Sequence, residues 1–591
     1  GALTSTQVQA LAPTQIAALT TTQMPQVAVT ALLSLSAAQF GALTSTQIGA
    51  ASTTQIAALT TTGVSLLSTT QVGGLTATEV AALATTQLAA ASSTQLGSLS
   101  TAAIAGLSTT DLAALTTTQL GGVTSTQMGV LSVTQIRGLS STDLGVLTTT
   151  QVGGLTSTQL GALTSVQAGN LTSTALGALT TTQLGGLSSA QLGGVTTTQI
   201  PGLTTTQLAA LTITQVKGLS GTQFGALTTT QLGSVTSTQL AGLTSTQVAG
   251  LTTTTLGALS TTQMGGLSQA TLSAMTSTQA ASLTTTLIPS LATTGLVTIG
   301  STAIAALSTT QLSYLSSTQL GVLSTTALAG LSTTQVAALT TTQVGGLVTT
   351  QMNALSSTQV SALTTTDIAA LAVTQVAGLS TTGIKALTTT QVVNLAPTQI
   401  AALTTTQLPQ MSTTQLGAIT LGQLGALTST QIAAVTTTQA AGLSTTDVAA
   451  LTTTQIGGVS ATALGVMTST QLANLTSTQL GALTIAALPR LSTTALAALT
   501  TTQLGGLAAT QVGVLTSTQM GVLTSTLVGA LSPAQLGGLT TTQVASLSTT
   551  GMAGLTSTQI AALTSTQASA FTSLQVVAMS ITQIDALVAV L

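Results

Sequence analysis

The chain contains no cysteine, no histidine and no tryptophan among its 591 residues. Without cysteine it can form neither a disulfide nor a thiolate metal site, and without histidine it has no imidazole ligand for zinc or haem. Acid–base catalysis by histidine and thiol nucleophiles are excluded for the same reason. The sequence therefore excludes active sites and metal sites that depend on cysteine or histidine.

Charge is nearly absent as well, because Asp, Glu, Lys and Arg make up 2% of the chain and the net charge is −2. A typical soluble domain has about 25% charged residues. Proteins that bind nucleic acid neutralise its phosphates with many Lys and Arg side chains, and this chain has only four basic residues. We therefore expect no nucleic-acid partner.

Long apolar runs are missing too, although 43% of the residues are hydrophobic and the mean hydropathy is +0.63. Thr, Ser and Gln interrupt the apolar residues every few positions, so no run approaches the length of about 18 residues that indicates a membrane span. We therefore expect no membrane-spanning segment. Aromatic residues are also scarce, at 1% of the chain: Phe40, Phe224, Phe571 and Tyr314.

The chain consists of variants of one eight-residue motif, which reads LTSTQIAA in residues 555–562. Counting Leu3 as position 1, this octad recurs 74 times up to Leu587 without an insertion or a deletion. Positions 1 and 6 are apolar, position 2 is Ser or Thr in 64 octads, position 5 is usually Gln, and positions 7 and 8 are mostly Gly or Ala. An unbroken register is typical of a solenoid whose units stack on their neighbours. We expect a single continuous octapeptide-repeat array over residues 1–591.

The pattern favours a short capped helix in each octad. With Ser or Thr at position 2 as N-cap, Gln at position 5 completes an S/T-x-x-Q capping box, and the apolar residues at positions 1 and 6 form the accompanying hydrophobic staple. Pro13, Pro397 and Pro533 then fall at the first helical position, which tolerates proline. The fold class we predict is a repeat solenoid, all-α, built of short capped helical turns.

Two further sets of residues bear on this helix. The acids Glu79, Asp111, Asp143, Asp367 and Asp447 stand at position 5, the exception being Asp585, and the bases Arg137, Lys217, Lys385 and Arg490 stand at positions 7 and 8. Acids at the start and bases at the end suit a helix dipole, although acids replacing Gln at a solvated site would give the same pattern. Proline at position 7 (Pro25, Pro201, Pro289, Pro409 and Pro489) lacks the N–H that would bond back to position 3, so each helix must be short.

A β-solenoid remains the alternative. Thr-rich segments such as Thr148–Thr150 favour strands, and Gly-Gly or Pro-Gly pairs favour turns. Positions 1 and 6 are five residues apart, however, and strand faces alternate every two residues, so both cannot point inward without a bend. Ser is also common at position 2, which suits a cap better than a uniform Thr face.

The stretch LTSTQIAALTSTQ and its variants resemble the low-complexity octad tracts of very large bacterial surface and secreted proteins. The resemblance covers essentially the whole chain and implies an extracellular or cell-surface role as an adhesin stalk, sheath or filament. Each octad also looks like the L-T-P-E-Q helix start of repeats in bacterial DNA-reading effectors. That likeness ends after about ten residues, and the basic DNA-contacting residues are missing here.

A search for chemistry in the sequence finds no candidate site. No G-x-S-x-G elbow and no phosphate-binding G-x-x-x-x-G-K-[ST] loop occurs, and the acids are widely spaced, as Asp111 and Asp143 show. Lys217 and Lys385 are interpreted as solvated helix ends and Tyr314 as a packing or surface variant, whereas the three Phe residues stand at core positions 1 and 6. We predict no catalytic, cofactor-binding or metal-binding residue, no cofactor, and no enzyme activity.

These observations favour an extracellular structural protein, a stalk, sheath or filament that associates with like chains. The alternative is a binding module whose regular Thr face contacts ice or a glycan. Gly1 and Ala2 stand where an octad would end, so we also expect the chain to be a mature or excised piece of a longer protein.

Overall fold

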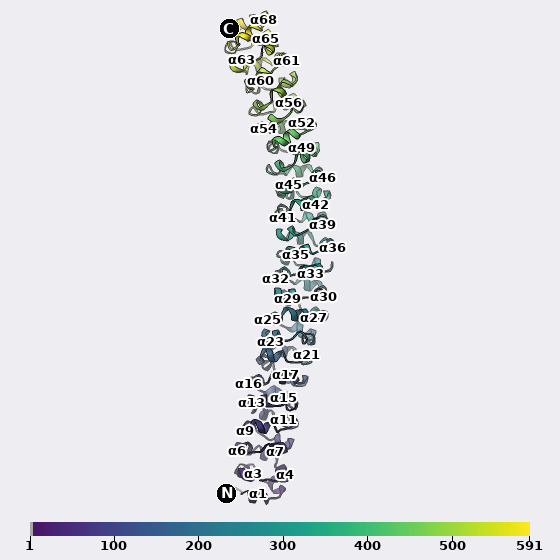
Figure 1. Ribbon diagram of the computed structural model, residues 1–591, viewed down its shortest axis with the longest axis vertical. Coiled ribbons are helices and arrows are strands. Elements are labelled where there is room, and N and C mark those ends of the chain that lie inside the picture. Colours follow the sequence, from purple (N-terminus) through teal and green to yellow (C-terminus); the bar gives the residue numbers. More distant parts are fainter. Residues whose placement is uncertain (1–3) are drawn as a thin grey trace. The chain divides into compact units, whose positions relative to one another are not determined.

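A computed structural model describes residues 4–591; Gly1, Ala2 and Leu3, the first position 1 of the register, lie outside the described residues. Within residues 4–591 there are 68 short α-helices, five 3₁₀ helices and no strand (Figure 1). The all-α solenoid is confirmed, and the β-solenoid alternative is wrong. The chain forms two compact units, residues 1–306 and 307–591, which are considered separately below.

The octads form short helices, and the α-helices share the same start. Every α-helix from α1 (Ser5–Gln9) to α67 (Ser573–Val577) begins at position 3 and ends at position 6, 7 or 8. The longest is α68 (Ile581–Val590), with ten residues. Positions 1 and 2 are extended between helices: Leu251 has φ −65° and ψ 131°, and Thr252 has φ −74° and ψ 158°. The chain therefore turns sharply once per octad.

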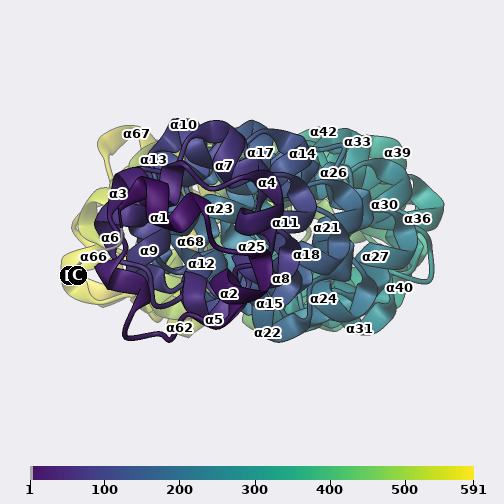
Figure 2. The same ribbon diagram turned by 90° about the horizontal axis from the view of Figure 1, so that it is seen from below.

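In the first unit, helices contact the helix three octads further along. Examples are α15 (Ser125–Val130) with α18 (Thr149–Gly154), and α26 (Gly221–Gly225) with α29 (Ser245–Gly250). Seen from the end of this unit, α1, α2 (Pro13–Ala17), α3 (Val29–Leu33) and α4 (Ala37–Gly41) run around a common interior (Figure 2). The octads of this unit thus wind into a superhelix whose successive turns stack on one another (Figure 1).

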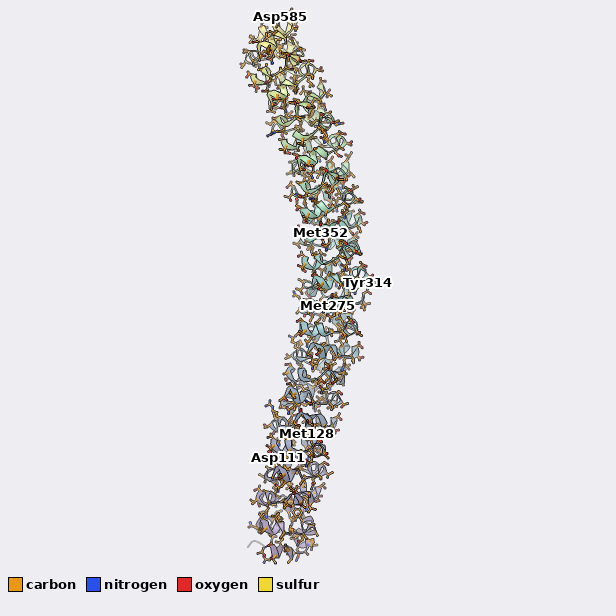
Figure 3. The ribbon with its side chains drawn as sticks, viewed as in Figure 1. Asp111, Met128, Met275, Tyr314, Met352 and Asp585 are labelled. Atoms are coloured by element: carbon orange, nitrogen blue, oxygen red, sulfur yellow. The ribbon has the colours of Figure 1, made fainter. Side chains whose placement is uncertain are left out.

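The second unit is built in the same way. Helix α49 (Leu421–Ala426) contacts α52 (Thr445–Ala450), and α65 (Ser557–Ala561) contacts α68. Met352, at position 6, is fully buried, whereas Tyr314 at position 8 projects from the surface with 49% of its area exposed (Figure 3). Of the two interpretations of Tyr314, a packing or a surface variant, the surface variant is confirmed.

The core of both units consists of the side chains at positions 1 and 6. Position 6 is buried from Val8 to Ala568, and most residues at position 1 are buried with it. Phe40 and Phe224 are buried as predicted. Phe571 is only half-buried, so its prediction as a core residue is wrong; few described turns follow it that could cover its ring.

Proline explains the five octads that are not α-helical. Each proline at position 7 lies in a 3₁₀ helix: η1 (Met24–Gln26), η2 (Ile200–Gly202), η3 (Ile288–Ser290), η4 (Leu408–Gln410) and η5 (Leu488–Arg490). A proline nitrogen cannot complete the α-helical bond to position 3, so the segment tightens into a 3₁₀ turn. The prolines at position 3 begin α2 (Pro13–Ala17), α47 (Pro397–Ala401) and α62 (Pro533–Gly537), as predicted.

Candidate functional site: a ladder of glutamine amides

The glutamine at position 5 caps its own helix. In α29 the backbone N–H of Gln247 donates to the hydroxyl of Thr244 over 3.3 Å, and the backbone N–H of Thr244 donates to Oε1 of Gln247 over 2.9 Å. Two of the N–H groups that a helix start leaves without partners are thereby satisfied. The predicted capping box is confirmed, and it recurs throughout both units.

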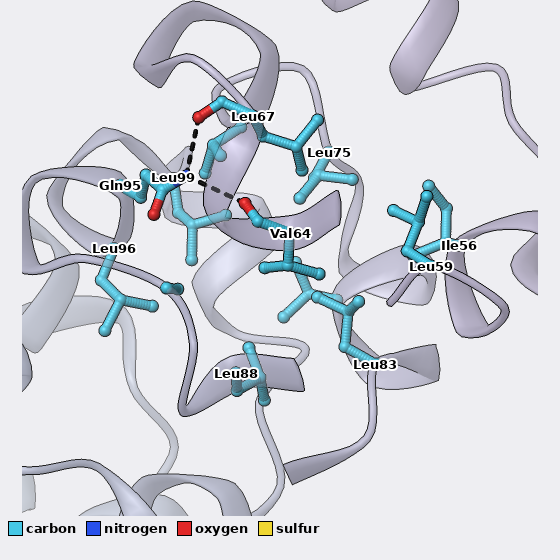
Figure 4. Close-up of a pocket in the computed structure, with 13 residues that line it drawn as sticks. Ile56, Leu59, Val64, Leu67, Leu75, Leu83, Leu88, Gln95, Leu96 and Leu99 are labelled. Carbon is cyan, nitrogen blue, oxygen red and sulfur yellow. Dashed lines mark hydrogen bonds between the residues drawn. The ribbon is translucent and has the colours of Figure 1, made fainter. Parts of the chain in front are cut away.

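The other end of the same side chain crosses to the previous superhelical turn. Nε2 of Gln247 donates to the carbonyl oxygens of Val216 at 2.7 Å and Leu219 at 2.6 Å. Gln95 makes the same pair of bonds to Val64 and Leu67, at 3.0 and 2.6 Å (Figure 4). The carbonyls of Val216 and Val64 also accept the backbone N–H of Leu219 and Leu67, each over 3.2 Å. The carbonyls of Leu219 and Leu67 follow the helix end, and the glutamine amide is the donor that reaches them. One glutamine therefore caps the start of its own helix and the end of a helix one turn earlier.

These bonds repeat as an amide ladder, the set of position-5 glutamines whose Nε2 bonds the preceding turn. Its first member is Gln39, bonded to Val8 and Leu11, and its last is Gln583, bonded to Met552 and Leu555. The acceptors lie 28, 30 or 31 residues back along the chain. A superhelical turn thus takes about three and a half octads.

Position 5 of the octad shows a preference for Gln over Glu that capping alone does not explain. A capping box accepts Glu as readily as Gln, and the helix dipole favours an acid in the first turn. Position 5 nevertheless holds Gln in 52 of the 74 octads, Asp in four and Glu in one. The preference for an amide is explained by its N–H₂ group, which donates to the preceding turn as no ionised carboxylate can.

Glycine at position 8 allows adjacent turns to approach closely. A Cβ added to Gly154 would overlap the carbonyl oxygen of Ser125, at position 3 of the octad three units earlier. A Cβ added to the neighbouring Gly153 would have no atom within 4 Å. The two glycines of one Gly-Gly pair therefore differ: Gly154 is required by the contact and Gly153 is not.

The residue types 29 positions before the glycines at position 8 agree with this contact. Ser, Ala or Gly stands 29 residues before sixteen of the twenty glycines at position 8, but before only ten of the fifty other residues there that have such a partner. At separations of 21 and 37 residues, which shift the comparison by one octad, the numbers fall to six and five of twenty. Small residues are thus paired across the three-octad contact that the structure shows.

Changing these two glycines to alanine should have opposite effects. Gly153→Ala should raise the free energy of unfolding by roughly 0.5–1 kcal/mol, because alanine is the better helix former. Gly154→Ala should lower it by roughly 1–3 kcal/mol, because the methyl group forces the turns apart. Chemical denaturation of the two single variants measures both changes, and equal effects would contradict the close approach.

The interior offers little room for a ligand. A void of about 20 Å³ in the first unit is lined by aliphatic side chains that include Ile56, Val64 and Leu88, with Gln95 as the polar exception (Figure 4). A buried water needs two to four polar partners, so a space of this size and lining suits neither water nor a cofactor. Across residues 4–591 no three Asp or Glu side chains gather as a metal site would require.

The charged residues divide between the interior and the surface. Glu79, Asp111, Asp143, Asp367 and Asp447 are buried at position 5 and accept the N-cap bond that glutamine accepts elsewhere, so the solvated-site interpretation of these acids is wrong. Lys217 and Lys385 are exposed in the last turn of their helices, and Asp585 is exposed in α68. Nε of Arg137 donates to the carbonyl of Ala162 over 2.8 Å.

The outer surface is made mainly of Ser and Thr at positions 2 to 4. Thr204, Thr205 and Thr206 are all exposed, and the hydroxyl of Thr204 is already engaged by the backbone N–H of Gln207. Position 2 thus serves the capping box, which leaves the hydroxyls of positions 3 and 4 as the regular outer rows. No helix in the described part of the chain has the length and hydropathy of a membrane span.

Comparison with known families supports a repeat tract. The sequence profile of the ALTTAQ repeat matches six segments: 104–141, 139–173, 174–205, 317–349, 364–397 and 528–565. Each match covers between 32 and 38 residues, about four octads. Comparison with curated proteins gave no match. Segments of both units are therefore similar to the ALTTAQ repeat.

Proposed function

We propose that this protein is an extracellular or cell-surface structural element, a stalk, sheath or filament that holds other parts at a distance and does no catalysis. The observation that carries the proposal is the uniformity of the amide ladder. Glutamines at position 5 make corresponding bonds to the preceding turn between Gln39 and Gln279 in one unit and between Gln343 and Gln583 in the other. Repetition of one contact suits a spacer, whose length grows with the number of octads.

Removing whole turns tests the spacer role. Deleting residues 205–260 takes out seven octads, which is two superhelical turns, and joins position 2 to position 3 in register. The maximum dimension from small-angle X-ray scattering should shorten by a fixed step, and a second deletion of equal length should double that step. Helicity per residue should not change. A maximum dimension independent of octad number would contradict the spacer.

Lateral association with like chains is part of this proposal. The surface has few charges to resist close approach, and its rows of Ser and Thr can form hydrogen bonds between neighbours. Sedimentation velocity over a range of protein concentrations should show association that persists at high salt. Labelling of intact cells of the source organism with an antibody against the array tests the location; labelling only after permeabilisation would contradict it.

A further inference from the structure

Glu79 occupies a rung of the amide ladder without having an amide. It stands at position 5 of α9 (Ala77–Ala82) with 3% of its surface exposed. Its Oε2 accepts hydrogen bonds from the backbone N–H of Thr76 at 2.6 Å and from the hydroxyl of Thr76 at 2.9 Å. Glutamine Oε1 accepts the backbone bond in other octads, as Gln71 does, and in some it accepts the hydroxyl bond too, as Gln119 does from Thr116. Glu79 therefore keeps the capping half of the glutamine's role.

The glutamine's other bond, to the preceding superhelical turn, requires a hydrogen-bond donor. One octad earlier, Nε2 of Gln71 donates to the carbonyl oxygens of Phe40 and Leu43, both at 2.8 Å. The residues at the same separations from Glu79 are Ile48 and Ala51, both buried. Glutamate matches glutamine in length and shape, so its second oxygen falls where the amide nitrogen falls. An ionised carboxylate there would face carbonyl oxygens at the negative end of a helix dipole.

No positive group is available to neutralise a charge at this place. Helices α6 (Thr53–Ala57) and α12 (Thr101–Ile104) pack against α9, and neither they nor the helix Ser45–Ile48 contain a titratable side chain. Glu79 is the only charged side chain between residues 4 and 110. Burial raises the pKa of the Glu79 carboxyl above its ordinary value of 4.5, against the lowering effect of the two bonds from Thr76.

We propose that Glu79 is a proton-binding rung of the ladder, whose neutral carboxyl group donates its O–H to the carbonyl oxygen of Ala51 in place of the glutamine amide. Binding one proton from water completes the contact between turns, and losing it places a negative oxygen against the carbonyls. The sign of the pH dependence follows. The contact is complete at low pH and is lost as the pH rises from 4.5 through the raised pKa.

Asp111 is bonded differently from Glu79, because its side chain is one methylene shorter. In Asp111, Oδ2 accepts from the backbone N–H and hydroxyl of Ser108, and Oδ1 accepts from the hydroxyl of Thr85 at 3.0 Å. Both oxygens are thus engaged as acceptors. Among the acids at position 5, only Glu79 has the length of a glutamine.

The chain contains a single glutamate, so labelling with ¹³Cδ-glutamate gives one NMR signal in the full-length protein. We expect this signal to titrate with a midpoint above 4.5, and a midpoint at or below 4.5 would overturn the proposal. Gln71→Glu places a second glutamate on a buried rung and should add a second signal with a raised midpoint. Gln15→Glu, on an exposed glutamine of the first turn, is the matched control with an ordinary midpoint.

Hydrogen exchange distinguishes this role from a merely structural one. In the wild-type chain, exchange of the amides in α5 (Ser45–Ile48) and α9 should accelerate more between low and neutral pH than the intrinsic chemical rate does. Glu79→Gln should abolish that excess and should be the better protected variant at neutral pH. An excess that persists in Glu79→Gln, or identical titration of Gln71→Glu and Gln15→Glu, would refute the proton-binding rung.

Discussion

Replacing Leu203, Leu211, Leu219 and Leu227 together by serine should unfold the superhelical turn that they line. All four stand at position 1, and none exposes more than 5% of its surface. Truncating one buried leucine costs about 2–5 kcal/mol, and a buried serine hydroxyl adds the cost of an unpartnered polar group. The combined loss matches or exceeds the whole stability of a typical domain, about 5–15 kcal/mol. Far-UV circular dichroism should show a clear loss of helical signal.

A matched control changes the same four octads on the outside. Thr206, Thr214, Thr222 and Thr230 stand at position 4 and are exposed. Changing all four to serine removes four methyl groups from the surface and should leave the spectrum as it is. An unchanged spectrum for the leucine variant would mean that position 1 is not the core.

Removing one amide of the ladder should have the largest effect of any single polar substitution. In Gln247→Met the side chain keeps its length but loses its donor and acceptor, so Leu219 O and Thr244 N–H lose their partners, whereas Val216 O keeps the backbone N–H of Leu219. Each buried group left unsatisfied costs about 1–3 kcal/mol. We expect a fall of several kcal/mol in the free energy of local opening, measured by native-state hydrogen exchange in α29 and the turn before it.

Gln15→Met separates the ladder from the cap. Gln15 accepts the N–H of Ala12 at 2.8 Å, as Gln247 accepts that of Thr244, but it is exposed and precedes the first member of the ladder. Its loss should cost about 0.5–1.5 kcal/mol, the value of one ordinary hydrogen bond. If the two variants were equally destabilised, the bonds between turns would contribute nothing.

The local structure could be predicted from the sequence because its causes lie within one octad. Thr at position 2, Gln at position 5 and the staple residues identify a capped helix start. Proline at position 3 marks the first helical residue, and proline at position 7 predicts a short helix; the 3₁₀ geometry of those octads is known only from the structure. Each of these signals acts over a few residues, where propensity and capping decide the outcome.

The superhelix and its ladder could not be derived in the same way. Their pitch depends on the extended residues at positions 1 and 2, whose small dihedral differences accumulate over three to four octads. Gln247 reaches Val216 only because those angles bring the two turns together. The excess of Gln over Glu and the pairing of small residues at a separation of 29 both carry this information. Neither signal is visible within a single octad.

The contact between turns can be tested directly with a disulfide, because the chain has no cysteine of its own. A Cβ added to Gly442 would lie 3.3 Å from Cβ of Thr413, close to the separation of about 3.8 Å that a disulfide prefers. The variant Thr413→Cys/Gly442→Cys should therefore oxidise readily within one chain. Thr413→Cys paired with Ala434→Cys or with Ala450→Cys, one octad to either side, should not. Equal cross-linking in all three, or none at Gly442, would contradict the contact between position 8 of one octad and position 3 of the octad three units earlier.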